Sequence, residues 1–300
     1  MRSSKGLALI AVNLAALIFG STALFGRLEV SAIWIVAVRG VFAAAVLALI
    51  ILIRRNPLTL SRPLLWRALL TGVLLAIHWV TFFLAVKLAS VAIATLTFAT
   101  FPFWTVTLTA LRQRKLPRAH DLIPCAGIVI AVLLIVDLRD ATIAGLDPSL
   151  LGFGILAGLA SAICFAIFSL ASQTLIGASH MTTLSLYQNI AVALVLLPFL
   201  PFDSAAPTTA FDWAALAALG LAATALAHQL YFFSLKFLPA SVCGSFVCLE
   251  PVYAIVLATL ILGDAVNWQM IAAGVLIVGS SLALLWRTER TAGQPPAAPG

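Results

Sequence analysis

The chain of 300 residues has a formal net charge of +7, and 63% of its residues are hydrophobic while only 9% are charged. A soluble domain has about 45–50% apolar and about 25% charged residues, so this composition excludes a soluble fold and predicts a membrane protein. The basic balance does not indicate a nucleic-acid partner, because nucleic-acid binders cluster Lys and Arg on a solvated surface and here the basic residues flank apolar runs.

Ten apolar runs follow one another along the chain, separated by charged and turn residues. Each run approaches the roughly 20 residues that a helix needs to cross a bilayer. The runs cover residues 7–26, 31–53, 65–86, 88–111, 121–137, 149–172, 182–202, 211–235, 237–263 and 267–286. We therefore expect an all-α membrane protein with ten transmembrane helices and with both termini on one side.

The basic residues predict which side that is. If the amino terminus is cytoplasmic, thirteen Lys and Arg residues fall in cytoplasmic segments, and only Arg27, Lys87 and Arg139 fall outside. Cytoplasmic loops are enriched in Lys and Arg. Both termini are therefore predicted to be cytoplasmic, in a multi-pass protein of a bacterial-type inner membrane.

The polar stretch "DLRDATIAGLDPSL" divides the ten runs into five and five. An odd number of spans per half makes the second half enter the membrane from the opposite face, which predicts two inverted five-helix repeats around a central cavity. Three pairs of identical residues match at a constant offset of 149: Phe83 with Phe232, Lys87 with Lys236, and Pro102 with Pro251.

The expected organisation follows from this division. A first repeat covers residues 1–137, and a periplasmic connector covers 138–148. A second repeat covers residues 149–287, and a disordered cytoplasmic tail covers 288–300.

Pro102 and Pro251 interrupt their spans near the middle. Because proline has no N–H, the carbonyls of Phe98 and Val247 lose a helical partner, and each helix is expected to kink. Kinks at matched depth indicate a shared cavity. The alternative is that the kinks only shape the packing of the helices.

Aromatic residues gather at mid-depth on the third and fourth spans. The stretches "AIHWVTFFLAV" and "TFATFPFWTV" contain the candidate substrate-binding residues His78, Trp79, Phe98, Phe101 and Trp104. Tryptophan is more typical of the membrane interfaces, because its N–H needs a partner, so a central tryptophan favours a pocket. Packing against helices or lipid is the alternative for each ring. On the seventh span, Tyr187 is a further candidate for substrate binding.

Two charges, Arg39 and Glu250, lie deep inside spans. Charged residues there are rare and face the bundle interior or a water-filled cavity. Glu250 is expected to bind a substrate ammonium group or to exchange a proton, with a structural partnership to Arg39 or to backbone groups as the alternative. Arg39 is expected to satisfy carbonyls near a bent helix or to snorkel towards the outer surface, with attraction of a substrate carboxylate as the alternative.

The sequence contains neither a G-x-x-x-x-G-K-[ST] loop nor an H-E-x-x-H signature. We therefore expect no cofactor, no metal and no enzymatic activity, with transport driven by gradients. In "GFGILAGLASA", Gly154 and Gly158 are interpreted as small residues that allow close helix contact. An intramembrane enzyme built on His78, Glu250 and a serine is an alternative from another class, and a non-transporting sensor is a second.

Several motifs resemble the EamA-type repeat of the drug/metabolite transporter superfamily. "LEPVYAIVLATLILGDAVNWQMIAAGVLIVGSSLAL" is similar to the end of such a repeat, "VRGVFAAAVLAL" to its second helix and "AALIFGSTALFGRL" to its first. Arg39 stands where the family motif has its arginine. The first repeat departs from the pattern, because Phe101 replaces the Glu that precedes the proline.

The resemblance implies ten helices in an inverted-repeat fold that exports small metabolites by alternating access. Within the superfamily, the chain resembles the YddG-like exporters of aromatic amino acids. The predicted function is export of small amphipathic metabolites, with aromatic or hydrophobic amino acids favoured as substrates. A broad-specificity drug or metabolite exporter is the alternative, and a monomer is the expected assembly.

Overall fold

The structure of the protein is a computed structural model that describes residues 2–22, 25–26, 28–89, 91–114, 116, 119–135, 148–250, 252–253, 256–257 and 268–292. Every regular element within these ranges is helical. The elements are α1 (Arg2–Thr22), α2 (Ala32–Arg54), α3 (Arg62–Leu88), α4 (Val91–Phe98), α5 (Phe101–Arg112), α6 (Ala119–Ile135), α8 (Pro148–Ile176), α9 (Met181–Leu196), η2 (Leu197–Phe202), α10 (Ala210–Ala218), η3 (Leu219–Leu226), α11 (Ala227–Phe237), α12 (Ala240–Val247) and α14 (Trp268–Ala292).

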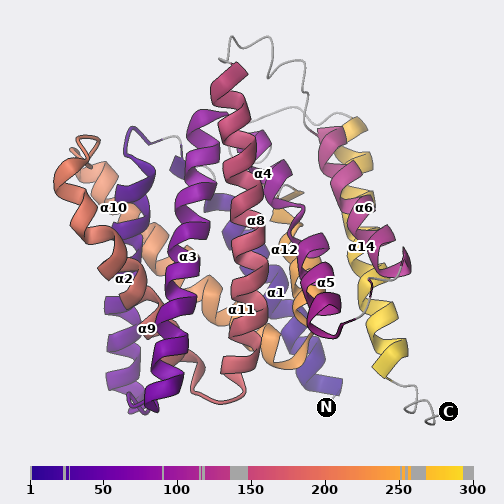
Figure 1. Ribbon diagram of the computed structural model, residues 1–300, viewed down its shortest axis with the longest axis horizontal. Coiled ribbons are helices and arrows are strands. Elements are labelled where there is room, and N and C mark those ends of the chain that lie inside the picture. Colours follow the sequence, from indigo (N-terminus) through magenta and orange to yellow (C-terminus); the bar gives the residue numbers. More distant parts are fainter. Residues whose placement is uncertain are drawn as a thin grey trace.

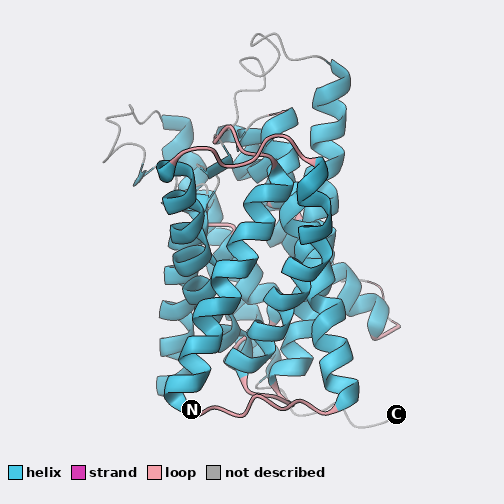
Figure 2. Cartoon of the chain, turned by 90° about the vertical axis from the view of Figure 1, so that its left-hand side faces the viewer, coloured by secondary structure: helices cyan, strands magenta, loops and turns pink. Residues whose placement is uncertain are grey.

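Six helical runs among the described residues are long and apolar enough to cross a membrane. They are Ser4–Thr22, Ala32–Arg54, Arg62–Leu88, Ser149–Ile176, Met181–Phe202 and Ala210–Phe237. The helices run roughly along one common direction (Figure 2). Figure 1 shows α8 passing through the middle of the bundle, with α2, α9 and α10 on one side and the pair α6 and α14 on the other. The protein is thus an all-helical membrane protein, as the composition predicts.

Polar residues in the loops fix where several helices begin. The hydroxyl of Ser31 accepts a hydrogen bond from the backbone N–H of Trp34 at the start of α2. It also donates to the carboxylate of Asp203, in the loop before α10. Thr209 and Asp212 form a capping box at the start of α10. These contacts satisfy backbone groups that a helix leaves open at its first turn.

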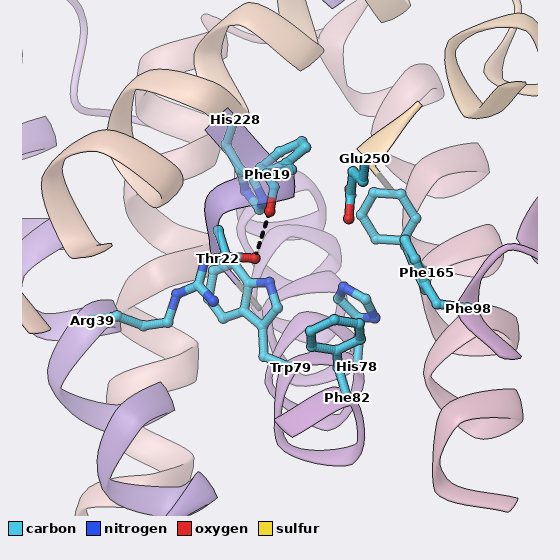
Figure 3. A pocket seen from close by; sticks show the side chains of 10 residues that line it. All are labelled: Phe19, Thr22, Arg39, His78, Trp79, Phe82, Phe98, Phe165, His228 and Glu250. Carbon is cyan, nitrogen blue, oxygen red and sulfur yellow. Dashed lines mark hydrogen bonds between the residues drawn. The ribbon is translucent and has the colours of Figure 1, made fainter. Parts of the chain in front are cut away.

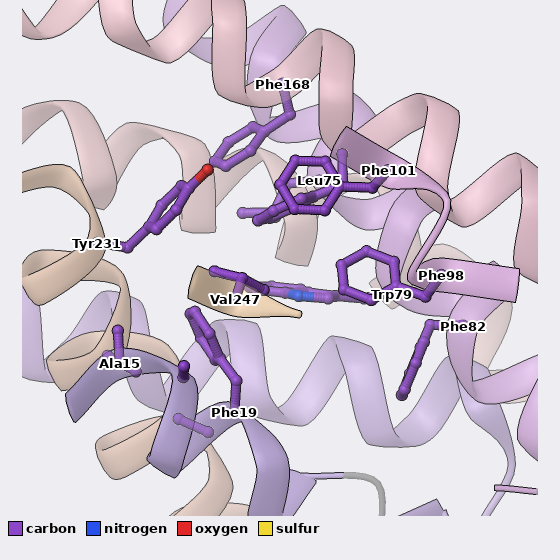
Figure 4. Packing of buried hydrophobic residues seen from close by; sticks show 14 of the residues in the cluster. Ala15, Phe19, Leu75, Trp79, Phe82, Phe98, Phe101, Phe168, Tyr231 and Val247 are labelled. Carbon is purple, nitrogen blue, oxygen red and sulfur yellow. The ribbon is translucent and has the colours of Figure 1, made fainter. Parts of the chain in front are cut away.

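Aromatic side chains fill much of the core between α1, α3, α8 and α11. Figure 4 shows Phe19, Trp79, Phe98, Phe168 and Tyr231 converging from different helices. Tyr231 is fully buried, and its hydroxyl lies 2.6 Å from the hydroxyl of Ser169 on α8. The buried polar end of this ring is therefore satisfied, as a phenol inside a membrane protein requires.

Glycines on α8 allow α3 and α4 to approach closely. A Cβ built on Gly154 would lie 2.7 Å from the Cβ of Ala89, and a Cβ on Gly158 would overlap the side chain of Thr97. Thr97 has little freedom to move away, because its hydroxyl bonds to the carbonyl of Ile93 at 2.8 Å and to that of Ala94 at 3.0 Å. The interpretation of these two glycines as close-contact residues is confirmed.

The fourth expected span is broken in the middle. The helix α4 ends at Phe98, and α5 begins at Phe101 with Pro102 in its first turn. The N–H of Thr100 bonds to the carbonyl of Thr97 at 3.3 Å, which is a tighter turn than an α-helix makes. Since Pro102 offers no N–H, the break falls where the sequence places the kink.

A second break occurs at the matching place in the other half. The helix α12 ends at Val247, and Cys248 and Leu249 form a turn before the helical residue Glu250. The expected kink at Pro251 lies outside the described residues, as does most of the ninth expected span beyond it.

The ends of the chain lie at one end of the bundle. The start of α1 and the last turns of α14 are both at the lower end in Figure 1. The helix α14 continues to Ala292, past the expected boundary of a tail at residue 288, and residues 293–300 lie outside the described part of the chain.

Gly158→Ala should lower the thermal unfolding midpoint, because the added methyl group overlaps the held side chain of Thr97. Overpacking of this kind costs about 1–3 kcal/mol. Gly152→Ala on the same helix is the matched control, since a Cβ there meets nothing within 4 Å. Equal midpoints for the two variants in detergent would contradict the close contact between α4 and α8.

Candidate functional site

A small cavity lies in the middle of the bundle, between the two helix breaks and the aromatic core. It has a volume of about 30 Å³, which is room for roughly two water molecules. Its lining comes from α1, α2, α3, α4, α8, α11 and the residue after the second break: Phe19, Thr22, Arg39, His78, Trp79, Phe82, Phe98, Phe165, His228 and Glu250 (Figure 3). Seven of these side chains carry aromatic rings, counting the two histidines, and two are ionisable groups of opposite type, the guanidinium of Arg39 and the carboxyl of Glu250.

Arg39 enters the cavity from α2 and is only 2% exposed. Its Nε donates a hydrogen bond of 2.9 Å to the hydroxyl of Thr224. Its guanidinium carbon lies 3.9 Å from the centre of the Trp79 ring, which is a close cation–π contact. One N–H and one face of the guanidinium group are therefore occupied by the protein.

A π-helical turn places Thr224 beside Arg39. The segment η3 has this wider winding, and π-turns are often found at functional sites. It approaches α2 closely at Gly220, where a Cβ would lie 2.6 Å from the Cβ of Phe42 and 3.0 Å from the carbonyl oxygen of Arg39. Glycine at this position therefore allows Thr224, four residues later, to reach the arginine.

Glu250 lines the same cavity and is 8% exposed. Figure 3 shows Arg39 at the left of the view and Glu250 to the right of its centre, with Trp79 next to Arg39 and His78 below Glu250. Among the described residues, no hydrogen bond or ion pair joins Glu250 to another side chain. The contacts of Arg39 are with Thr224, Trp79 and Phe83. The role of Glu250, including the alternative of a structural partnership with Arg39 or with a backbone group, stays a prediction.

Two histidines complete the polar part of the lining. The Nδ1 of His78 lies 2.7 Å from the hydroxyl of Ser161 and 3.1 Å from its carbonyl oxygen. The ring of His228 lies 5.2 Å from that of Trp79 and is 1% exposed. Within the part of the chain that is described, the Nδ1 of His228 has no hydrogen-bond partner. This nitrogen is therefore an unpaired polar atom on a residue that lines the cavity.

Phe98 is the centre of the aromatic lining. Its ring centroid lies 5.2 Å from that of His78, 5.8 Å from Phe82 and 5.5 Å from Phe165. Offset and edge-on arrangements at these distances are favourable for aromatic pairs. A flat apolar solute would find ring faces and edges of this kind on α3, α4 and α8.

The structure brings together five of the residues that the sequence singles out: Arg39, His78, Trp79, Phe98 and Glu250. Phe101 is fully buried and stacks behind Phe98 at 5.6 Å, against Gly244 of α12. Trp104 is only partly buried, and its indole N–H donates a hydrogen bond of 3.2 Å to the hydroxyl of Thr100, the residue just before its own helix. Neither residue is part of the lining.

Tyr187 also lies away from the cavity. Its hydroxyl donates a hydrogen bond of 3.0 Å to the carbonyl of Leu58, in the turn between α2 and α3. The residue has this structural contact because α9 begins at Met181, which places Tyr187 near the end of the bundle.

Sequence reasoning did not select His228, Phe165, Phe82, Phe19 or Thr22. A signal for His228 was present, because the offset of 149 that relates the two halves maps Trp79 onto it. Phe82 follows His78 by one helical turn and shares its face. Nothing in the sequence distinguishes Phe165 or Phe19 from other phenylalanines in the spans. Their role depends on which helices pack together.

The described residues contain no group of three or more His, Cys, Asp or Glu side chains that could hold a metal ion. Cys125, Cys243 and Cys248 are buried and Cys164 is partly buried, and none of the four is in a disulfide. They lie in apolar surroundings and pack as small side chains. The chemistry of the cavity is thus that of one guanidinium group, one carboxyl group, one hydroxyl group, two imidazoles and aromatic rings.

An aromatic cavity with deep charges, inside a helical membrane bundle, is typical of a carrier for small molecules. Comparison with known proteins agrees. The EamA-like transporter family matches residues 6–137 and again residues 152–286, so the chain belongs to this family and contains two EamA domains. An uncharacterized transporter, YxxF of Bacillus subtilis (strain 168), is 27% identical over 227 residues, which cover 74% of this chain and 70% of that protein.

The fold is also present among solved structures. One crystal structure of a protein superposes with a TM-score of 0.73 and covers 96% of this chain and 99% of its own. The sequence identity is 21%, so this likeness concerns the fold. The protein is therefore a multi-pass membrane transporter with a small-molecule substrate, and not an enzyme.

Thr224→Val should lower the thermal unfolding midpoint, because the substitution keeps the shape of the side chain and leaves the buried Nε of Arg39 without its acceptor. A lost hydrogen bond between membrane helices costs roughly 1–2 kcal/mol. Thr81→Val is the control, since the hydroxyl of Thr81 bonds only to carbonyls of its own helix. A midpoint for Thr224→Val equal to that of the control would show that Arg39 does not depend on this contact.

Proposed function

We propose that the protein exports amphipathic zwitterions, with aromatic or hydrophobic amino acids as the favoured substrates. The observation that carries the proposal is the pair of opposite charges, Arg39 and Glu250, in one aromatic cavity without a direct contact between them. A buried charge is costly unless it has a partner. A solute with both a carboxylate and an ammonium group would provide a partner for Arg39 and a partner for Glu250.

Each part of such a solute has a counterpart in the lining. The carboxylate goes to the guanidinium edge of Arg39, whose Nε and ring-facing side are already occupied. The ammonium group goes to Glu250 on the other side of the cavity. The aromatic side chain goes among Phe82, Phe98 and Phe165, because one face of Trp79 is covered by Arg39.

The size of the cavity supports transport by alternating access. A volume of about 30 Å³ admits water and excludes an amino acid, so binding requires the helices around it to move apart. The breaks at Ala99–Thr100 and Cys248–Leu249 are suited to this, since each interrupts a helix next to a lining residue. Phe98 precedes the first break, and Glu250 follows the second.

The proposal includes ten transmembrane helices in two inverted repeats, with boundaries as the sequence predicts. Two contacts between residues exactly one repeat offset apart support it. The Sγ of Cys248 lies 3.7 Å from the carbonyl oxygen of Ala99, and the ring of His228 lies 5.2 Å from that of Trp79. Two residues related by a two-fold axis can be in contact only if both lie next to that axis. Because Trp79 and His228 line the cavity, the axis is expected to pass through it.

The orientation is part of the same proposal: both termini are cytoplasmic, and the connector 138–148 is periplasmic, in a bacterial-type inner membrane. It rests on the distribution of Lys and Arg. An experimental structure whose two halves share one orientation in the membrane would contradict the inverted arrangement.

A broad-specificity exporter is the second candidate function. The aromatic lining favours it, because ring faces bind many flat solutes with little discrimination. The two candidates differ in what the charges do. A zwitterion carrier needs both the carboxylate and the ammonium group of its solute, whereas a broad exporter also moves aromatic amines that lack a carboxylate.

Proteoliposomes that contain the purified protein test the proposal directly. Labelled tryptophan, phenylalanine, alanine and tryptamine are supplied in turn, and saturable movement is measured with and without a pH gradient. Saturable transport of the aromatic amino acids is expected, with tryptamine moving poorly. Equal rates for tryptophan and tryptamine would favour the broad exporter, and no saturable movement of any amino acid would reject the proposal.

Phe98→Ala should reduce transport of tryptophan more than transport of alanine, because the aromatic part of the substrate loses a wall of its subsite. A nucleic-acid base stacked on an aromatic side chain gains about 1–3 kcal/mol. If the substrate ring makes a comparable contact with Phe98, its loss corresponds to roughly a tenfold reduction in tryptophan transport. Trp104→Ala is the matched control, since Trp104 lies outside the lining. Equal losses for both substrates would indicate damaged packing instead of a lost contact.

Glu250→Gln should abolish transport while the protein still folds, because the amide keeps the shape and hydrogen bonding of the side chain but removes its charge and its titration. The readouts are uptake at acidic and neutral pH, together with the thermal unfolding midpoint. Wild-type transport at every pH would exclude both ammonium binding and proton exchange by this residue. Failure of the variant to insert would instead assign Glu250 a structural role.

A further inference from the structure

The turn between α2 and α3 is a concentrated basic surface at one end of the bundle. The stretch "RRNPLTLSRPLLWR", residues 54–67, contains Arg54, Arg55, Arg62 and Arg67 and no Asp or Glu. All four arginines are exposed. Because α2 ends at Arg54 and α3 begins at Arg62, the four side chains lie around one corner of the bundle. We name these four residues and the turn 55–61 the arginine corner.

The arginine corner has a fixed shape. The hydroxyl of Thr183 donates a 2.7 Å hydrogen bond to the carbonyl of Pro57, and that of Tyr187 donates a 3.0 Å bond to the carbonyl of Leu58. Both donors belong to α9, from the other half of the chain. Arg55 has a left-handed backbone with φ of 52°, and it ends α2. The positions of the arginines are therefore set by tertiary contacts as well as by the helices.

An apolar stripe runs from the arginine corner along the outer face of α3. It consists of Trp66, Leu70 and Ile77, which lie on the same face as Arg62 and are 58%, 63% and 43% exposed. In a multi-pass membrane protein these residues face hydrocarbon. Tryptophan at the end of such a stripe that is nearest the basic residues is typical of the interface, where the lipid glycerol groups lie.

We propose that the arginine corner and this stripe bind one anionic phospholipid. The headgroup phosphate contacts the arginines, because guanidinium groups bind phosphate in a bidentate manner. Trp66 lies beside the glycerol region, and an acyl chain runs along Leu70 and Ile77. A cluster of basic residues without acidic neighbours, directly next to an apolar membrane-facing stripe, matches the two parts of such a lipid in charge and in depth.

The fixed turn separates this proposal from general attraction between basic loops and an acidic membrane. General attraction depends only on the number of charges near the surface, whereas a site depends on where they are held. Tyr187 is the residue that distinguishes the two. It carries no charge, but its hydroxyl holds the carbonyl of Leu58 and so the position of the turn.

The test is titration of the full-length protein in nonionic detergent with phosphatidylglycerol, with the lipid-bound fraction measured by native mass spectrometry. Each basic residue contributes about fivefold in affinity, so Arg62→Gln combined with Arg67→Gln should weaken binding roughly 25-fold. Arg112→Gln combined with Arg114→Gln is the matched control, because these arginines are exposed at the end of α5, outside the arginine corner. The control should bind like the wild type.

Tyr187→Phe is the second variant, and it keeps all four arginines. Weaker binding of phosphatidylglycerol by this variant is expected, and wild-type affinity would overturn the proposed site in favour of general charge attraction. Phosphatidylcholine should bind weakly, and inorganic phosphate should not displace the lipid. Equal affinity for phosphatidylglycerol and phosphatidylcholine would also overturn the proposal. So would displacement of phosphatidylglycerol by inorganic phosphate at a concentration equal to that of the lipid.

Discussion

The buried cation of Arg39 is the constraint on which the centre of the molecule depends. A guanidinium group deep inside a membrane protein needs acceptors and a favourable surface around it, because no bulk water solvates it there. Thr224 supplies the acceptor, and the face of Trp79 supplies a cation–π contact that is worth about 2 kcal/mol when it is desolvated. These two contacts join α2 to η3 and to α3, and so they set the distances between three helices.

Other features of the centre follow from this one. The π-helical winding of η3 and the small residue Gly220 bring the Thr224 hydroxyl to the arginine. The same segment leads into α11, where His228 lies one helical turn after Thr224 and against Trp79. The position of the ring of Trp79 is thus fixed from both sides of the cavity. Glu250 is left across the cavity, next to a helix break and without a partner among the described residues.

The two EamA domains contribute different chemistry to one cavity. At the offset of 149 residues, Trp79 corresponds to His228, and Phe101 corresponds to Glu250. The first half supplies Arg39 and the lining rings on α3 and α4, whereas the second half supplies the carboxyl group of Glu250. The two halves therefore differ at positions related by this offset, and at one such pair, Trp79 and His228, the two rings lie 5.2 Å apart in the cavity.

The sequence by itself determined the membrane environment, the positions of most helices and the presence of two deep charges. These features are local: an apolar run of sufficient length must cross the bilayer as a helix, and a charge inside it stands out against its neighbours. Only the tertiary structure decided which side chains share the cavity. Phe165, Phe19 and His228 belong to it, whereas Trp104 and Tyr187 do not, although all five are aromatic rings within or near spans. The reason is that the face a helix turns inward depends on the crossing of helices far apart in sequence, and the contacts of Arg39, of the α8 glycines and of the two helix breaks set that crossing.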